Sequence, residues 1–473
     1  MSMFKGFSNA FKIPELRKKI LITLGLVAVC RLVSLVPAIG VDWVALQTAV
    51  ADRIANASNS SGFSMFDWFD AFTGGALGQC SIGFLSIWPY ISAQIVIQLL
   101  SSVIPSLQKM KKEGENGRQQ LAQITRYLTI GICIAQSYGV CTALLHPQSM
   151  GLQGMIVTPD VIGSTTSFYF MNILGMTTAS LFVMWVADQI TTFGIGNGGS
   201  LIIMINIASR LPNAIMSAWH RYFKPIAGQQ RASIAEFAVV MLIGFAVIMG
   251  TVLLTQGVRK VAIHATRRAM GGGNTYGMQQ TFMPLRVNYA GVMPIIFAQP
   301  LITIPGALLA RIQTGRSGFL DSLHNLGENL QNMTSTTHLV IMAAMILFFT
   351  FFWVATQFNA VEISDNLKKD GSYVPGIRPG SATAEYLDAV MTRVTLIGAT
   401  GLLVVALVPS LLMRIFTKPT PINWSIVSFF GGTSLLIIVG VALDTLRIME
   451  SHLLVRKYDG FLRHGSLRGR GGM

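Results

Sequence analysis

The sequence is poor in charged residues, in cysteine and in paired catalytic groups. Charged residues make up 12% of its 473 residues, whereas a soluble domain averages about 25%. Its four cysteines form no Cys-x-x-Cys pair and no cluster with histidine, so the sequence indicates neither a metal site nor a disulfide framework. With 52% hydrophobic residues and a mean hydropathy of +0.55, the composition favours a membrane protein.

Long apolar stretches in the sequence indicate membrane-spanning helices. A bilayer core about 30 Å thick needs roughly 20 mostly apolar residues in a helix, and none of the stretches alternates as a barrel strand would. The sequence therefore predicts an all-α membrane protein with ten transmembrane helices. They are expected at residues 20–36, 82–104, 121–145, 168–190, 201–219, 234–255, 289–309, 339–358, 394–415 and 425–446.

The first apolar stretch could be a secretory signal, because Lys12 and the basic run 17–19 precede it. Arg31 interrupts the stretch, however, and no small-residue cleavage site follows it. We therefore expect the stretch to remain as the first span.

Lysine and arginine gather in alternate connections, which sets the expected orientation. Cytoplasmic loops carry an excess of these residues, so we expect both termini in the cytoplasm, although Arg210, Arg221, Lys224 and Arg231 depart from the pattern near the outward connection 220–233. The net charge of +15 is then explained by topology and contact with anionic lipids, not by reading of nucleic acid. The expected cytoplasmic segments are 1–19, 105–120, 256–288, 359–393 and 447–473.

Few charged side chains lie deep in the spans, and this shortage argues against several functions. Asp188, Glu236, Glu362 and Asp444 fall near span ends, so Arg31 is the main deep charge. An ion-coupled transporter needs ionisable groups at mid-membrane, and an intramembrane hydrolase needs paired carboxylates, a nucleophile with its base, or metal ligands. We therefore expect no enzymatic activity and no cofactor.

Helix-disturbing residues occupy the spans instead. Pro89 lies in the second span and Pro294, Pro300 and Pro305 lie in the seventh. Broken helices are tolerated in lipid where the freed backbone faces protein or a watery cavity. A pathway through the bundle is one explanation, and kinks filled by neighbouring helices are the other.

Seven sequence blocks, in this order and spacing, resemble the SecY/Sec61 family of protein-conducting channels. The resemblance covers almost the whole chain, including Arg31, Ser34, Pro37 and Gly40 of the first span, although Trp88 and Gly199 depart from the commoner family pattern. The blocks are IWPYISAQI at 87–95, KKEGENGR at 111–118, QITRYLT at 123–129, GIGNG at 194–198, DNLKK at 365–369, VPGIRPG at 374–380 and FGGTSLLI at 430–437.

The resemblance implies two halves of five helices, 20–219 and 234–446, related by a pseudo-two-fold axis in the membrane plane. An hourglass pore would run between the halves in the bacterial plasma membrane. Unfolded preproteins would cross it, and signal sequences or membrane segments would leave sideways between the second and third spans and the seventh and eighth.

The family's pore is constricted by a ring of aliphatic side chains. A narrow apolar neck excludes water and ions by dewetting and offers a passing chain no charge to bind. The alternative for each position is an ordinary packing isoleucine. By motif alignment the matching positions are Ile87, Ile91, Ile203, Ile207, Ile296 and Ile437.

A plug, which in the family closes the resting pore from outside, corresponds to residues 63–80. This segment combines aromatic residues with small ones, which suits a short, displaceable helix, and an amphipathic hairpin on the outer surface is the alternative. The plug residues singled out are Phe66, Trp68, Phe69, Phe72, Gly74 and Gly75.

The two large cytoplasmic loops would dock the partner that drives the substrate. The resemblance implies the SecA ATPase for secretion, the ribosome for membrane insertion, and the small subunits SecE and SecG. No phosphate-binding loop is expected in this chain, since residues 194–199 lack the Lys-Ser/Thr ending. The candidate docking residues are Arg259, Lys260, Arg267 and Arg268 in one loop and Lys368, Lys369 and Arg378 in the other.

Arg378 is the strongest docking candidate because it lies among turn-forming residues, between Gly376 and Gly380. For the other basic residues topology alone is sufficient. Two other functions fit parts of the pattern: a secondary transporter with an inverted repeat, and a scaffold that anchors cytosolic partners.

Overall fold

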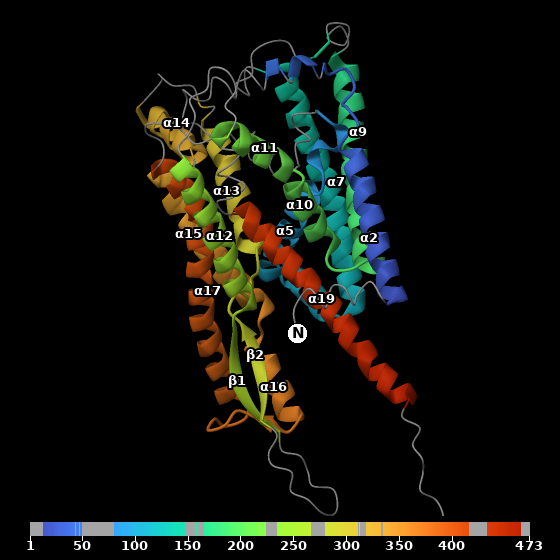
Figure 1. The fold of residues 1–473 in the computed structure, drawn as a ribbon, viewed down its shortest axis with the longest axis vertical. Coiled ribbons are helices and arrows are strands. Elements are labelled where there is room, and N and C mark those ends of the chain that lie inside the picture. The colour runs from blue at the N-terminus through green and yellow to red at the C-terminus, as the bar shows by residue number, and fades with distance from the viewer. Residues whose placement is uncertain are drawn as a thin grey trace, which may run out of the picture. The chain divides into compact units, whose positions relative to one another are not determined.

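The structure is a computed structural model and is mostly helical (Figure 1). It describes residues 13–42, 44–46, 48–49, 80–147, 157–158, 165–223, 234–265, 280–310, 312, 318–332, 334–415 and 433–464. Within these residues six helical stretches are long and apolar enough to cross a bilayer, which supports a multi-pass membrane protein. They are Ile82–Val103, Glu115–Leu145, Thr165–Phe193, Phe237–Gln256, Thr336–Lys369 and Ser381–Val408.

The chain divides into two compact units. The first contains the described residues up to Arg210 together with those from Val441, and the second contains Leu211–Gly440. In the first unit α7 packs on both α5 and α9, while α2 and α10 pack on α9. Its elements are α2 (Pro14–Val33), the 3-10 helix η1 (Ile82–Leu85), α5 (Trp88–Val103), α6 (Pro105–Lys112), α7 (Glu115–Leu145), α9 (Thr165–Phe193), α10 (Gly198–Ala208) and most of α19 (Thr433–His464).

The second unit combines membrane helices with a small sheet. In it α13 packs on α14 and α15, and α17 packs on α12, α15 and α16. Its elements are α11 (Leu211–Tyr222), α12 (Ile234–Gln256), β1 (Val258–Ala265), β2 (Gln280–Arg286), α13 (Met293–Leu309), α14 (Gly318–Gln331), α15 (Thr336–Gln357), α16 (Ala360–Lys369), β3 (Ser372–Tyr373) and α17 (Ser381–Ile415).

The sheet has the order β2-β1-β3, with both pairings antiparallel. Val258 lies opposite Arg286 and His264 opposite Gln280, while β3 pairs with the far end of β1 through His264 and Tyr373. Pro284 is tolerated because β2 is an edge strand, where a missing N–H costs no ladder hydrogen bond.

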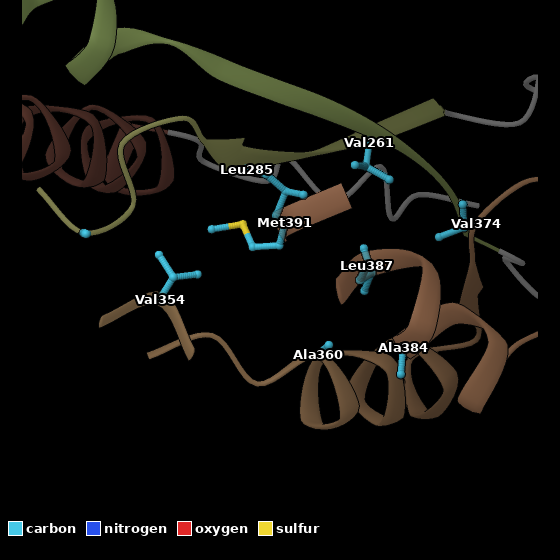
Figure 2. Packing of buried hydrophobic residues seen from close by; sticks show 9 residues of the cluster. Val261, Leu285, Val354, Ala360, Val374, Ala384, Leu387 and Met391 are labelled. Carbon is cyan, nitrogen blue, oxygen red and sulfur yellow. The ribbon is translucent and has the colours of Figure 1, made fainter. Parts of the chain in front are cut away.

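A buried cluster joins this sheet to α16 and the start of α17 (Figure 2). Val261 of β1 and Leu285 of β2 lie at one side, and Leu387 and Met391 of α17 lie at the other. Leu387 is completely buried. We call the sheet, α16, the 374–380 turn and the first turns of α17 the platform.

All four cysteines lie in the first unit and are buried. For Cys80, which precedes the span that begins at Ile82, burial raises the pKa of the thiol to about 12, with a smaller contribution from Cys141. A thiol of this pKa is protonated at neutral pH and is therefore a weak nucleophile.

The structure differs from the sequence prediction in several places, of which three matter here. The expected fifth span is two helices, because Ser209 caps α10 and Pro212, in the first turn of α11, has no N–H to continue the helix. The connection expected between the sixth and seventh spans contains the β1–β2 hairpin, so the fold is not purely helical. Finally, α19 continues to His464, past the expected span end at Leu446.

The platform core generates a stability prediction. Leu387→Ala removes a fully buried side chain and should cost about 2–5 kcal/mol of unfolding free energy. Leu396→Ala, on the same helix but 52% exposed, is the matched control and should cost far less. Thermal unfolding in detergent checks the difference, and equal losses would contradict the packing described.

Candidate functional site

The six isoleucines proposed for the ring are all buried in the structure. In the first unit, Ile87 and Ile91 lie at the start of α5 and are 2% and 7% exposed, while Ile203 and Ile207 lie on α10 and are 6% and 3% exposed. The i,i+4 spacing places each pair on one face of its helix. The two pairs are therefore held by two short helix segments of one unit.

A sharp break in the chain positions Ile87. Ser86 has a positive φ of 47°, unusual for a residue with a side chain, and its N–H donates to the carbonyl of Gly83 at 3.0 Å. Ile87 then caps α5, and Pro89 occupies the first turn of the helix, where a missing N–H costs nothing. Pro89 thus begins a helix and does not kink one.

The segment before this break is fixed to the end of α2. Ile82 N–H donates to the carbonyl of Val36 at 2.9 Å, and Ala38 N–H donates to the carbonyl of Cys80 at 2.7 Å. Gly83 allows the close approach, because a Cβ there would lie 2.8 Å from the Val33 carbonyl oxygen. The end of α2 and the residues that follow it therefore set the position from which α5 starts.

The glycine-rich block 194–198 performs the same task for α10. Gly196 has a φ of +83°, and the side chain of Asn197 caps the helix by accepting from the N–H of Ser200 at 3.1 Å. Gly198 donates to Thr191 Oγ1 at 2.9 Å and has no room for a side chain, because a Cβ would overlap the carbonyl of Ala187. The block therefore forms the start of α10 and is held against α9 by this hydrogen bond and close contact.

The two elements that carry the isoleucine pairs of the first unit, the start of α5 and α10, contact each other near both ends of α10. Near its start, a Cβ on Gly199 would lie 3.6 Å from Ile87 Cδ1. Near its end, Asn206 Nδ2 donates to Ser86 Oγ at 3.1 Å, and Arg31 donates to Asn206 Oδ1 at 3.2 Å. Sequence reasoning identified Arg31 but missed Asn206 and Ser86. The rule that a polar side chain inside a span needs a partner could have found Asn206.

In the second unit Ile296 and Ile437 are 3% and 1% exposed. Ile296 lies in the first turns of α13, which is capped by Val292 and carries Pro294 at its start. Gly440 of α19 lies against Val292, since a Cβ there would be 3.0 Å from Val292 Cγ1. The segment of α19 that carries Ile437 therefore lies close to the start of α13 at Gly440.

Except for Cys80, the predicted plug lies outside the described residues. All of its singled-out positions are affected, so the plug stays a prediction. These positions are Phe66, Trp68, Phe69, Phe72, Gly74 and Gly75.

The candidate docking residue Arg378 is exposed on a well-anchored turn of the platform. Gly376 and Gly380 adopt φ values of +80° and +107°, conformations that favour glycine. Ser364 Oγ of α16 donates to the carbonyl of Gly380 at 2.7 Å, and Thr383 Oγ1 of α17 donates to that of Arg378 at 2.9 Å. Two helices thus hold the turn, while the guanidinium side chain faces solvent.

The other candidate docking residues surround the same platform. Lys368 and Lys369 are exposed in the last turn of α16, where cations complement the helix dipole, and Arg259 and Lys260 are exposed on β1. Arg267 and Arg268 lie outside the described residues. The platform also exposes the carboxylates of Glu362, Asp365, Asp370, Glu385 and Asp388.

Because both signs of charge are present, a partner would have to recognise particular cations of the platform and not a uniform positive field. A guanidinium held at a fixed tip suits such recognition, since it can form two parallel hydrogen bonds to a carboxylate or a phosphate.

Comparison with known proteins gives a consistent result. The family model SecY matches residues 81–446. The protein translocase subunit SecY of Streptomyces coelicolor is 39% identical, over 98% of this chain and 100% of its own length. The protein translocase subunit SecY of Escherichia coli is 37% identical, over 97% of this chain and 96% of its own length.

The fold is similar to that of a solved channel with a TM-score of 0.54 and 14% identity, covering 95% of both chains. That structure is described as showing that the plug domain of the SecY protein stabilises the closed state of the translocation channel and maintains a membrane seal. The family model covers residues 81–446 and the two relatives cover nearly the whole sequence, and on their strength this chain belongs to the SecY family.

Proposed function

We propose that this chain is the central subunit of a protein-conducting channel that passes unfolded secretory proteins across a bacterial plasma membrane and releases membrane segments sideways into the bilayer. The observation that carries the proposal is the full-length similarity to two protein translocase subunits. The same similarity gives no support to the transporter considered from the sequence.

The proposed architecture is ten spans in two inverted halves of five. Its support is a correspondence between α5 and α13, each of which begins with a proline followed two positions later by a ring isoleucine: Pro89 and Ile91 in one, Pro294 and Ile296 in the other. The capping residues before them also share nearly the same backbone conformation, with φ and ψ of −86° and −3° at Ile87 and −93° and −6° at Val292.

The six isoleucines form the constriction in this proposal. Their side chains offer only aliphatic carbon, so a translocating chain finds no hydrogen-bonding partner and no charge, and its passage is tolerant of sequence. An apolar neck of this kind also dewets and so resists the leak of ions. Binding that is weak along the whole path is what a conduit for many different clients requires.

The plug at residues 63–80 closes the resting channel from the outer side. Its support is the resemblance, since the solved SecY structure of similar fold is described in terms of such a plug. The small residues at its end make it easy to displace when a client enters.

The driving force comes from partners that bind the platform. We propose SecA and the ribosome at Arg378 and its neighbouring cations, SecE and SecG beside the spans, and anionic lipids along the basic cytoplasmic edge. The distribution of lysine and arginine supports cytoplasmic termini. The chain itself performs no chemistry in this proposal.

Polar substitution in the ring tests the constriction. Ile203→Asn should raise the resting ion conductance and admit clients with defective signal sequences, because an amide holds water in the neck. Ile205→Asn is the control, since Ile205 lies on the opposite face of α10. Planar-bilayer recordings check the conductance, and equal currents from the two variants would exclude Ile203 from the ring.

Charge reversal tests the docking turn. Arg378→Glu should abolish motor-driven secretion while leaving the protein stable, because the side chain is exposed and only the backbone of the turn is anchored. Arg393→Glu, also exposed and also in the second unit, should secrete normally. Transport of a preprotein into vesicles is the measurement, and unchanged export by Arg378→Glu would refute the docking role.

Deletion tests the plug. Removing residues 66–77 should increase the ion leak of the resting channel, because nothing then covers the outer mouth. Ion flux from vesicles that carry the purified complex measures the leak. A membrane that stays tight would refute the assignment of this segment.

A further inference from the structure

A hydrogen-bonded network of three polar side chains connects the first span to both ring helices of the first unit. Arg31 of α2 donates to Asn206 Oδ1 at 3.2 Å, and Asn206 Nδ2 donates to Ser86 Oγ at 3.1 Å. Asn206 is 3% exposed and Ser86 6% exposed. The chain therefore keeps a charged group and two buried polar groups in contact inside an apolar bundle.

The chemistry of the three groups fixes the direction of the hydrogen bonds. A guanidinium can only donate, so the amide oxygen of Asn206 must face Arg31. The amide nitrogen then faces Ser86, whose hydroxyl oxygen accepts. The amide oxygen of Asn206 thus binds the first span and its amide nitrogen binds the break before α5. An apolar residue of similar size could form neither hydrogen bond.

The network lies next to the residues proposed for the ring. Ser86 directly precedes Ile87, and its positive φ of 47° is a conformation that persists when surrounding contacts enforce it. Asn206 directly precedes Ile207 and lies three residues after Ile203. The hydrogen bond between Asn206 and Ser86 therefore ties the residue before Ile87 to the residue before Ile207.

We propose that Arg31, Asn206 and Ser86 are positioning residues that hold α5 and α10 in the spacing that keeps the resting channel closed. This inference rests on the proposed function, because it assigns the network's effect to the ring. The three residues touch no client in this mechanism. The three residues act by holding Ile87, Ile91, Ile203 and Ile207 in place. Substituting any of the three should therefore resemble a defect of the ring more than a defect of folding.

A second buried asparagine allows the two kinds of defect to be distinguished. Asn172 of α9 is completely buried in the same unit, and its Nδ2 donates to the carbonyls of Ile39 and Phe168. It carries the same chemical group and bonds to another part of the chain, but it contacts neither α5 nor α10 through those hydrogen bonds. Asn172→Leu therefore reports the general cost of removing a buried amide.

The test compares resting conductance and signal-sequence stringency in the reconstituted full channel complex. Asn206→Leu and Ser86→Gly should each raise resting conductance about tenfold, because losing a buried hydrogen bond shifts a closed–open equilibrium by that order. Glycine at position 86 tolerates the positive φ, so it removes the hydroxyl without adding strain. Asn206→Asp should remain close to the parent, since a carboxylate can accept from both Arg31 and the Ser86 hydroxyl.

Three results would overturn the inference. Asn172→Leu could raise the conductance as much as Asn206→Leu does, or Ser86→Gly and Asn206→Leu could both leave it unchanged while Ile203→Asn raises it. In these two cases the network has no positioning role and the proposed function stands. If Ile203→Asn also has no effect, the ring itself is refuted and the inference falls with it. Should Asn206→Leu fail to accumulate, Ser86→Gly decides the question alone.

Discussion

Hydrocarbon offers a polypeptide no hydrogen-bonding partner, and this constraint governs where the chain can interrupt its helices. Three breaks close to the ring positions of the first unit supply their own partners. Ser86 bonds back to Gly83, Asn197 caps the start of α10, and the N–H of Ser209 bonds to Ile205. An interrupted helix leaves backbone groups that need such partners, and the ring candidates of the first unit lie next to these interruptions. A helix start is well suited to hold such a side chain, because caps and close glycine contacts fix its position from several directions.

The platform is built on a different principle from the membrane portion. It is a small assembly with many exposed charged side chains, in which a sheet, two helices and a tight turn share one apolar cluster around Leu387 and Met391. Its exposed cations are therefore carried by a frame with its own core. A contact made at Arg378 reaches α16 and α17 through the hydrogen bonds of the turn, and most of α17, Ser381–Val408, is itself a candidate membrane span.

Much of this organisation could be predicted from the sequence. The apolar stretches indicated a multi-pass membrane protein, the motif blocks indicated the family, and the turn around Arg378 was recognised by its glycines and proline. The isoleucines could be selected by motif alone, because hydropathy cannot distinguish a ring residue from a packing one. All six are buried, but burial does not test their role.

Other features were missed for identifiable physical reasons. Val261 and Ile263 place apolar side chains at alternate positions of β1, and such alternation indicates a strand. The prediction missed the strand because this connection was considered only for its lysines and arginines. The extension of α19 was missed because hydropathy marks the edge of the bilayer and not the end of a helix. The contacts of Asn206 with Arg31 and Ser86 join positions far apart in the sequence, so no local pattern could reveal them. The break at Ser209, by contrast, was signalled by the nearby proline.

The burial of every native thiol has a practical consequence for probing this molecule. Cys30, Cys80, Cys133 and Cys141 are shielded within the first unit, and the Cys80 thiol stays protonated at neutral pH. Maleimides or bifunctional crosslinkers applied to the folded protein should therefore modify an engineered surface cysteine against a silent background. The wild-type sequence can serve as its own labelling template, without the destabilising removal of four packed side chains.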